Sequence, residues 1–189
     1  MIRRVNLFGG PGVGESTLAA RFFAHLKQQK ANIELVQEFV KQYVYEGRRI
    51  RSWNYVHTFA SQFEAEHRLM QGGVQRIVTD SPLLLQCVYA KHHGCVVHQQ
   101  LAQICKRFDE EFPSLNFFVR RNFHFQEVGR WENEGQAIEM DRIIEETLNR
   151  HDIIYTPVRP GHQCDVDYCY RLLKDTFENT RTNHACSGA

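Results

Sequence analysis

Residues 9–17 read Gly-Gly-Pro-Gly-Val-Gly-Glu-Ser-Thr, and the interpretation of the whole chain starts from them. The stretch matches the phosphate-binding loop pattern G-x-x-x-x-G-K-[ST] at every fixed position except the lysine, where Glu15 stands. The apolar run from Arg4 to Phe8 precedes the loop and suits a buried strand, and apolar residues at helical spacing follow it. A strand, a glycine-rich turn and a helix in this order predict a loop that holds phosphate groups.

The loop residues have the chemistry that a polyphosphate needs. Glycines let backbone N–H groups turn inward, the following helix presents its positive N-terminal end, and Ser16 offers a hydroxyl to Mg²⁺. A plain tight connection between strand and helix is the alternative. We therefore expect ATP and Mg²⁺ as ligands, with the nucleotide held by Gly9, Gly10, Pro11, Gly12, Val13, Gly14, Glu15, Ser16 and Thr17.

Glu15 reverses the charge at the position where such a loop has its lysine. The lysine places a positive charge between the outer phosphates, whereas a carboxylate repels them. At about 4 Å and an effective dielectric constant near 20, one unit-charge interaction is worth on the order of 4 kcal/mol. We expect weak triphosphate binding and slow transfer, partly offset by Mg²⁺ or a neighbouring arginine. One nucleotide change turns a lysine codon into a glutamate codon. Glu15 is therefore compatible with three origins, namely a native residue, a substitution engineered to disable turnover, and a sequence error.

The composition is that of one globular domain. The chain has 189 residues, 42% hydrophobic and 24% charged, and its 23 Lys plus Arg balance 22 Asp plus Glu. A net charge of +1 does not indicate a general nucleic-acid binder, although a local basic groove is compatible with it. The sequence has no 18-residue apolar span and no signal peptide, so we expect a cytoplasmic protein with no membrane partner.

The cysteines and histidines give little indication of a metal. Six cysteines, at positions 87, 95, 105, 164, 169 and 186, form no C-x-x-C pair, which favours free thiols in a reducing compartment. His92, His93, Cys95 and His98 are close enough in sequence to suggest zinc, but their spacing matches none of the usual ligand pairs. A polar loop at a helix end is the favoured interpretation.

Strand-like runs alternate with helical stretches along most of the chain. The five runs are Arg4 to Phe8, Ile33 to Gln37, Arg76 to Thr79, Leu115 to Arg120 and Ile153 to Val158. This alternation predicts an α/β fold, a three-layer αβα sandwich around a mostly parallel five-stranded sheet with ligands at the carboxyl ends of the strands. We expect one domain over residues 1–179 and a polar, poorly ordered tail over 180–189.

Two acidic residues follow predicted strands at the edge where ligands bind. Glu38 ends the second strand, where a carboxylate could accept the proton of an attacking hydroxyl or hold a metal-bound water. Asp80 follows the third strand directly, the layout of a Walker B carboxylate that holds Mg²⁺ or orients the acceptor. A solvated charge at a strand end is the alternative for each. The candidate metal ligands are thus Ser16 and Asp80.

Together these segments resemble the P-loop nucleoside and nucleotide kinases, particularly phage-type thymidylate-kinase-like proteins, including 5-hydroxymethyldeoxyuridine DNA kinases, and the nicotinamide riboside kinase group. The resemblance covers most of residues 2–158. It rests on the P-loop, on Glu38-Phe39-Val40, on Thr79-Asp80-Ser81-Pro82-Leu83-Leu84 and on a lid-like segment beginning at Asn116. It implies transfer of the γ-phosphoryl group of ATP to a hydroxyl of a nucleoside-type acceptor, with Glu38 and Asp80 flanking that hydroxyl.

The resemblance also implies a small helical lid, over about residues 121–140, that supplies arginines to the transferring group. Arg120, Arg121 and Arg130 match that role by position, and guanidinium groups suit phosphate oxygens. Surface charges are the alternative. These three arginines join Glu38 and Asp80 as candidate catalytic residues.

The segment from His57 to Met70 takes the place that lines the acceptor pocket in related kinases. Gln62 could hydrogen-bond the edge of a nucleobase, and Phe59 or Phe63 could stack on the base. Aromatic residues at helical spacing are otherwise typical of a core.

A basic and aromatic stretch lies near the expected acceptor site. Arg48, Arg49 and Arg51 interleave with Trp53 and Tyr55, which could grip a nucleic-acid backbone and stack on a base. A solvated helix end is the alternative. The acceptor therefore stays open between a free nucleoside, a nucleoside monophosphate and 5-hydroxymethyluracil in phage DNA, the last of which would place the protein in the host cytoplasm.

Two other functions are compatible with the sequence. A nucleotide-binding module that lost catalysis through Glu15 would bind ATP without acceptor-dependent release of ADP. A P-loop ATPase acting with a macromolecular partner would hydrolyse ATP without a small acceptor.

Overall fold

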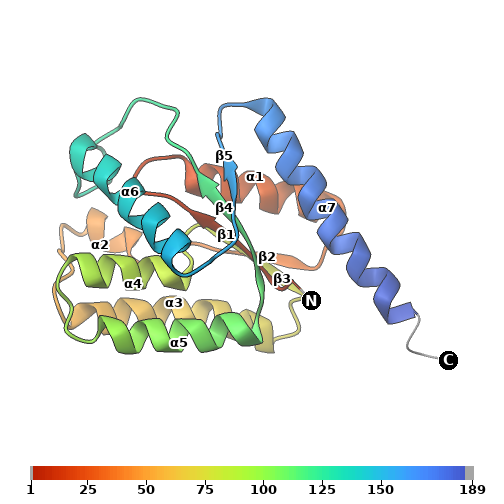
Figure 1. Cartoon of the computed structure of the whole chain (residues 1–189), viewed down its shortest axis with the longest axis horizontal. Coiled ribbons are helices and arrows are strands. Elements are labelled where there is room, and N and C mark those ends of the chain that lie inside the picture. Colours follow the sequence, from red (N-terminus) through yellow and green to blue (C-terminus); the bar gives the residue numbers. More distant parts are fainter. Residues whose placement is uncertain (1, 186–189) are drawn as a thin grey trace.

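The computed structural model describes residues 2–185, with side chains as far as Phe177. Its five strands form one parallel sheet in the order β2-β3-β1-β4-β5 (Figure 1). The strands are β1 (Arg4–Phe8), β2 (Ile33–Val36), β3 (Arg76–Thr79), β4 (Ser114–Val119) and β5 (Thr156–Val158). Pro157 is tolerated in β5 because this strand is at the edge of the sheet, where a missing N–H breaks no ladder.

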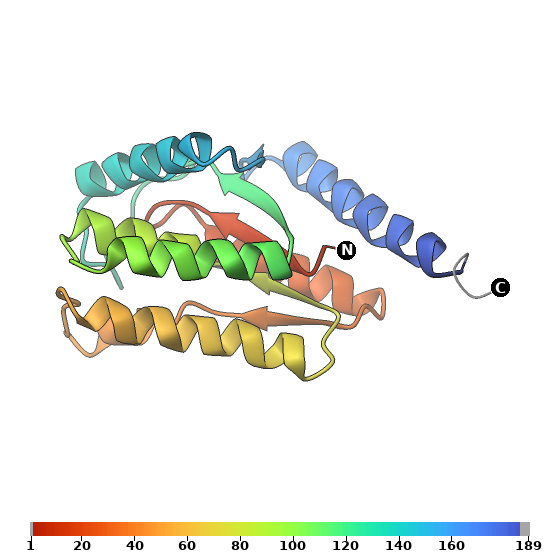
Figure 2. The ribbon, with the colours of Figure 1, turned by 60° about the horizontal axis from the view of Figure 1, so that its bottom comes forward.

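Helices cover both faces of the sheet. They are α1 (Glu15–Gln28), α2 (Lys41–Tyr45), α3 (Asn54–Gln71), α4 (Leu83–His92), α5 (His98–Glu111), α6 (Glu134–Arg150) and α7 (Gln163–Ala185). The buried residues of α1 and α7 form one core with the sheet, whereas α2 to α6 pack into two clusters on the opposite face (Figure 2). This arrangement confirms the predicted αβα sandwich.

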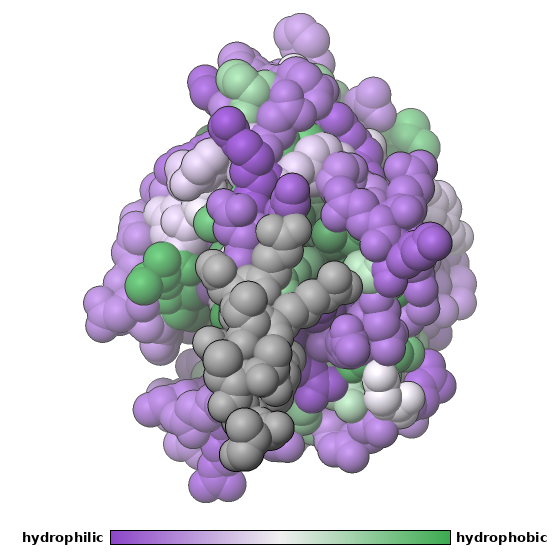
Figure 3. Space-filling view, turned by 90° about the vertical axis from the view of Figure 1, so that its right-hand side faces the viewer, coloured by the Kyte–Doolittle hydropathy of each residue, from purple (hydrophilic) through white to green (hydrophobic). Residues whose placement is uncertain are grey.

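The strands are apolar on both sides because helices bury both sides. Every residue of β1 is buried, and Val5 and Leu7 belong to the core beneath α1. Arg4 is the charged exception, and it forms ion pairs with Glu66 of α3 and Asp109 of α5. The end of the molecule near the C-terminus of α7 is mostly hydrophilic, with only scattered apolar residues (Figure 3).

The structure differs from the sequence-based expectations at several boundaries. The strand expected from Ile153 forms ladder bonds only from Thr156. The expected helical lid is irregular until α6 begins at Glu134, after a capping box made by Asn133 and Gln136. The backbone of α7 continues to Ala185, into the segment expected to be a poorly ordered tail, and residues 186–189 lie outside the described part.

The described cysteines are free, and Cys186 lies outside the described residues. His92, His93, Cys95 and His98 do not gather into a metal-ligating group. Within residues 2–185, the one close group of this kind is His162, Cys164 and Asp165, which is largely exposed and whose Asp165 already binds Arg159. None of the described helices has the length and apolar character to cross a membrane.

Candidate active site

The P-loop connects β1 to α1 at the carboxyl edge of the sheet. Gly12 and Gly14 have φ angles of 77° and 95°, a left-handed conformation that glycine adopts without strain. A Cβ atom on Gly12 would lie only 2.7 Å from Nε of Arg130. Glycine at this position therefore permits both the turn of the loop and the close approach of the Arg130 side chain.

A second clamp on the loop comes from α6, and the sequence analysis missed it. The backbone N–H of Gly10 donates a 2.9 Å hydrogen bond to Oδ1 of Asp141. Arg121 donates from Nε to Oδ2 of Asp141 at 2.8 Å and from Nη2 to the carbonyl oxygen of Pro11 at 3.0 Å. Asp141 thus holds the Arg121 guanidinium against the P-loop.

The structure separates the three arginines expected at the site. Arg121 and Arg130 contact the P-loop, as described above. Arg120 turns away instead, because its guanidinium pairs with Glu145 of α6 and lies 4.8 Å from the centre of the Phe118 ring. Arg120 does not line the cavities that flank the loop.

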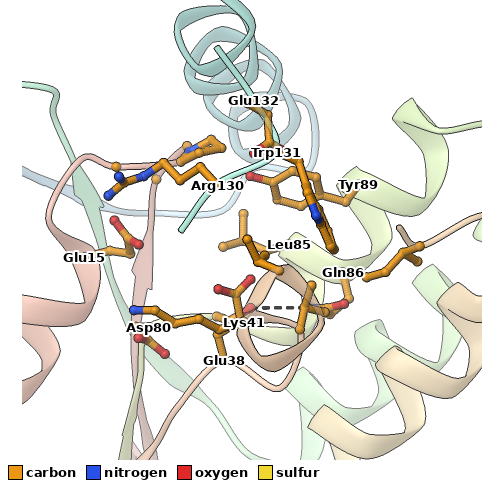
Figure 4. A pocket seen from close by; sticks show the side chains of 18 of the residues that line it. Glu15, Glu38, Lys41, Asp80, Leu85, Gln86, Tyr89, Arg130, Trp131 and Glu132 are labelled. Atoms are coloured by element: carbon orange, nitrogen blue, oxygen red, sulfur yellow. Dashed lines mark hydrogen bonds between the residues drawn. The ribbon is translucent and has the colours of Figure 1, made fainter. Parts of the chain in front are cut away.

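A cavity of about 120 Å³ opens on one side of the P-loop (Figure 4). The loop side of this cavity carries the charged residues Glu15, Glu38, Lys41, Asp80 and Arg130. The far side carries mostly apolar and aromatic residues, namely Val40, Val44, Ile50, Tyr55, Leu85, Tyr89 and Trp131, together with Gln86, His93 and Glu132. We refer to it as the acceptor cavity, after the ligand that the sequence analysis expects beside Glu38 and Asp80.

Three carboxylates come together at the loop end of the acceptor cavity. Burial, followed by the negative charges of Asp80 and Glu15, raises the pKa of Glu38 to about 8. Burial also raises the pKa values of Glu15 and Asp80. The charge of Lys41 opposes the rise in pKa at all three carboxyl groups. The site therefore concentrates negative charge that a bound cation would neutralise.

Ser16 and Asp80 fit the Mg²⁺ that such a loop uses. The Asp80 side chain is 6% exposed, and its Oδ1 atom has no hydrogen-bond partner among the described residues. The Ser16 hydroxyl donates to Oε1 of Glu15 at 3.5 Å, and its proximity to Asp80 lowers the pKa of that carboxyl group. Carboxylate and hydroxyl oxygens are the hard ligands that Mg²⁺ prefers.

Of the polar groups on the far side of the acceptor cavity, Tyr55 belongs to the stretch expected near the acceptor, whereas Gln86 and His93 were not expected there. Gln86 is buried, and its Nε2 donates a hydrogen bond to Oγ of Ser81 at 3.1 Å. The amide oxygen of Gln86 takes no part in this bond. The Tyr55 hydroxyl lies 2.5 Å from Nδ1 of His93. Gln86 follows the Thr79–Leu84 block closely in sequence, and this proximity is the only signal that would have indicated it.

The four residues expected to bind the acceptor lie elsewhere. Gln62 is fully buried, where it accepts from the Phe39 N–H at 3.1 Å and donates to Oγ1 of Thr79 at 3.4 Å. Phe59 is in the core, and Phe63 packs with its ring 5.1 Å from that of Phe108. Arg48 is exposed and pairs with Glu46. The structure brings none of the four to the lining of the acceptor cavity.

A larger cavity, of about 400 Å³, opens on the other side of the loop. It is lined by Gly12, Gly14, Thr17, Leu18, Arg21, Phe123, His124, Gln126, Arg130 and Pro160. Gly12 and Arg130 border both cavities. The P-loop therefore runs between two hollows, an arrangement with room for one ligand on each side of the loop.

Comparisons with known proteins agree with this geometry at the level of fold. A family model described as an AAA domain, AAA_28, matches residues 4–164. No curated protein matches the chain.

Solved structures with the same fold include enzymes that act on nucleosides and nucleotides. A NadR protein in complex with NR has a TM-score of 0.62 and 17% identity over 86% of this chain, which spans only 46% of that protein. Thymidylate kinase from Ehrlichia chaffeensis has a TM-score of 0.61 and 12% identity, covering 93% of this chain and 98% of the kinase. Deoxyadenosine kinase from M. mycoides with dCMP and dCDP has a TM-score of 0.54 and 16% identity, and the match covers 94% of this chain and 99% of the kinase.

Proposed function

We propose a kinase activity on the premise that the chain belongs to the AAA domain family AAA_28 and has the fold of P-loop kinases. In this proposal it transfers the γ-phosphoryl group of ATP, with Mg²⁺, to a hydroxyl of a nucleoside-type acceptor. The observation that carries the proposal is the position of the P-loop between two cavities, with Glu38 and Asp80 in the smaller one. ATP would occupy the larger cavity with its phosphates on the loop, and the acceptor would occupy the smaller one.

The residues of this chain have complementary tasks in the transfer. Glu38 lies in the acceptor cavity and takes the proton of the attacking hydroxyl. The hydroxyl oxygen forms a bond to the γ-phosphorus as the bond to the bridging oxygen breaks, and ADP leaves. Arg121 and Arg130 stand at the loop, where their charges stabilise the transferring group. Mg²⁺, held by Ser16 and Asp80, supplies positive charge to the phosphate oxygens.

The far side of the acceptor cavity favours an acceptor without a phosphate. Glu132 is the acidic residue of this side, and the aromatic rings of Tyr55, Tyr89 and Trp131 complete the wall. Lys41 and Arg130 are the cavity's only Lys or Arg within the described part of the chain, and both line it near the P-loop. Carboxylates and aromatic rings attract cations and repel phosphate. A neutral nucleoside, or one with a positively charged base such as nicotinamide riboside, therefore suits the cavity better than a nucleoside monophosphate.

A panel of acceptors tests this proposal. Labelled γ-phosphate transfer would be compared among nicotinamide riboside, neutral nucleosides, nucleoside monophosphates, and DNA with and without 5-hydroxymethyluracil. We expect a preference of roughly 10-fold or more for acceptors without a phosphate. The Glu132→Gln variant should lose the preference for the cationic nucleoside and keep activity on neutral ones. Preferred transfer to a monophosphate or to DNA would contradict the assignment of the acceptor.

The pH dependence of the reaction reports on Glu38. This carboxyl group is a base only when ionised, and the pKa of Glu38 is raised to about 8. We therefore expect kcat/KM to rise about tenfold per pH unit below pH 8 and to level off above it. Glu15→Lys should move the midpoint to lower pH, because the charge of Glu15 contributes to the raised pKa. Glu38→Gln should be slow at every pH, and a wild-type profile that falls between pH 6 and 8 would rule out this role.

Glu15 favours a second candidate function, a nucleotide-binding module without catalysis. The Oε2 atom of Glu15 is buried at the loop without a hydrogen-bond partner among the described residues, so it faces the triphosphate as an uncompensated acceptor. Such a module would bind MgATP and show no transfer to any acceptor of the panel.

A further inference from the structure

The P-loop lacks its lysine, yet the acceptor cavity contains another one close to the loop. Lys41 is the first residue of α2 and lines the same cavity as Glu15, Glu38 and Asp80. Figure 4 shows its side chain extending across the cavity toward Glu15 and Asp80. The position of Lys41 thus brings an ammonium group to the region where the lysine of a P-loop acts.

The other cation that lines the acceptor cavity is already engaged. Arg130 donates hydrogen bonds to the carbonyl oxygens of Gln126 and Val128, and its guanidinium lies against Gly12. Lys41, in contrast, makes no hydrogen bond and no ion pair with any residue of the described region, and it is exposed to solvent. Its charge acts on the carboxyl groups of Glu15, Glu38 and Asp80 without a direct bond to any of them, so the ammonium can bind an incoming ligand.

The two residues before Lys41 hold its backbone in place. Val40 is buried in the core below α2, and the Phe39 N–H donates to the buried Gln62 side chain. These contacts fix the base of the Lys41 side chain, whereas its four-carbon stem can adjust to the phosphates. Lys41 follows β2, whereas the P-loop follows β1, and β3 lies between these two strands in the sheet. The long side chain of Lys41, held at its base, spans this separation.

We propose that Lys41 replaces the missing P-loop lysine and binds the outer phosphates of ATP from the acceptor side. The proposal rests on the kinase function proposed above and names the group that makes transfer feasible despite Glu15. It also assigns a task to the Glu38-Phe39-Val40-Lys41 segment beyond supplying the base. Glu38 would act on the acceptor hydroxyl, while Lys41, three residues further along the chain, would act on the group that the hydroxyl attacks.

Lys41→Ala in the protein with Glu15 tests the proposal. We expect MgATP affinity, measured by calorimetry, to fall roughly 10-fold and the transfer rate to fall roughly 100-fold, because the described part of the chain offers the phosphates no other unengaged cation in this cavity. Lys41→Arg should restore part of both. The matched control is Lys106→Ala, an exposed lysine on α5 far from the loop, which should change neither quantity. Lys41→Ala should still fold, with at most a small change in thermal unfolding, since the side chain makes no hydrogen bond or ion pair among residues 2–185 and acts on Glu15, Glu38 and Asp80 through its charge alone.

The decisive comparison uses the Glu15→Lys background. With a lysine restored at position 15, Lys41→Ala should reduce the transfer rate by less than about 5-fold, because the two lysines have the same task. An equal loss in both backgrounds would overturn the replacement role, as would unchanged affinity and transfer in Lys41→Ala with Glu15 present. If no variant transfers phosphate, the kinase function fails, and the MgATP affinities still decide the role of Lys41. A loss of MgATP affinity in Lys41→Ala that occurs only with Glu15 present supports that role. An unchanged MgATP affinity in Lys41→Ala with Glu15 present refutes it.

Discussion

Glu15→Lys is expected to raise the rate of γ-phosphoryl transfer roughly 100- to 1,000-fold and to tighten MgATP binding. The substitution removes a carboxylate that repels the outer phosphates and restores a cation that attracts them. Each unit-charge interaction is worth on the order of 4 kcal/mol at about 4 Å before screening. Lys41 and bound Mg²⁺ offset part of the repulsion, so the expected gain is about half of the unscreened sum.

Two further variants separate the effects of charge at position 15. Glu15→Gln removes the repulsion without adding a cation, so its transfer rate should lie between those of the unsubstituted and Glu15→Lys proteins. Glu34→Lys makes the same charge change in β2, where Glu34 pairs with Lys27 away from the site, and should leave transfer unchanged. Initial rates with labelled ATP and calorimetric titration with MgATP measure the series. A Glu15→Lys protein no faster than the unsubstituted protein would contradict the electrostatic explanation.

Asp80→Asn is expected to lower transfer roughly 1,000-fold and to leave the fold intact. The substitution preserves the shape of the side chain and removes the negative charge that, in the proposed function, would hold Mg²⁺ beside Ser16. Stability should stay the same or rise at neutral pH. Burial raises the pKa of Asp80, so the folded state disfavours the ionised form, and a neutral amide avoids that cost.

Slower transfer together with unchanged or higher stability in Asp80→Asn would show that Asp80 serves the reaction rather than the fold. Transfer assays measure the first effect, and thermal unfolding at pH 7 measures the second. Asp152→Asn is the matched control, because Asp152 is exposed and its φ of 53° is one that asparagine also adopts. Asp80→Asn protein that keeps more than about a tenth of the transfer rate would contradict the assignment of the metal site.

Local motifs predicted which residues lie together on the loop side of the cavity. Gly9 to Thr17, Glu38 and Asp80 each follow a strand closely, and the carboxyl ends of parallel strands meet at one edge of the sheet. Strand order within the sheet did not have to be known for this argument. Strand ends alone therefore located the charged half of the acceptor cavity.

The far side of the cavity depends on how helices pack, which spacing alone does not determine. The helix containing Phe59 and Gln62 was correctly expected, but it turns these residues toward the sheet, where Gln62 supports Phe39 and Thr79. Tyr89 and Trp131 line the cavity without belonging to any motif. Packing of α4 and of the irregular lid segment, rather than a sequence pattern, brings them there.

Sequence position also did not determine which arginine of the lid segment contacts the P-loop. Arg120 and Arg121 are adjacent in sequence, and both matched the expected position. One pairs with Glu145 on the outside of α6, and the other is held at the P-loop by Asp141. Both partners lie on α6, and which arginine each of them binds depends on the orientation of this helix.

The central claim is that this P-loop serves phosphoryl transfer to a nucleoside, and one assay tests it most directly. The unsubstituted and Glu15→Lys proteins would be incubated in parallel with γ-labelled ATP, Mg²⁺ and nicotinamide riboside or a neutral nucleoside, and the products separated by chromatography. We predict labelled nucleoside phosphate and an equal amount of ADP, with more of both from the Glu15→Lys protein. Label that stays in ATP, or appears only as inorganic phosphate, with both proteins would contradict the claim.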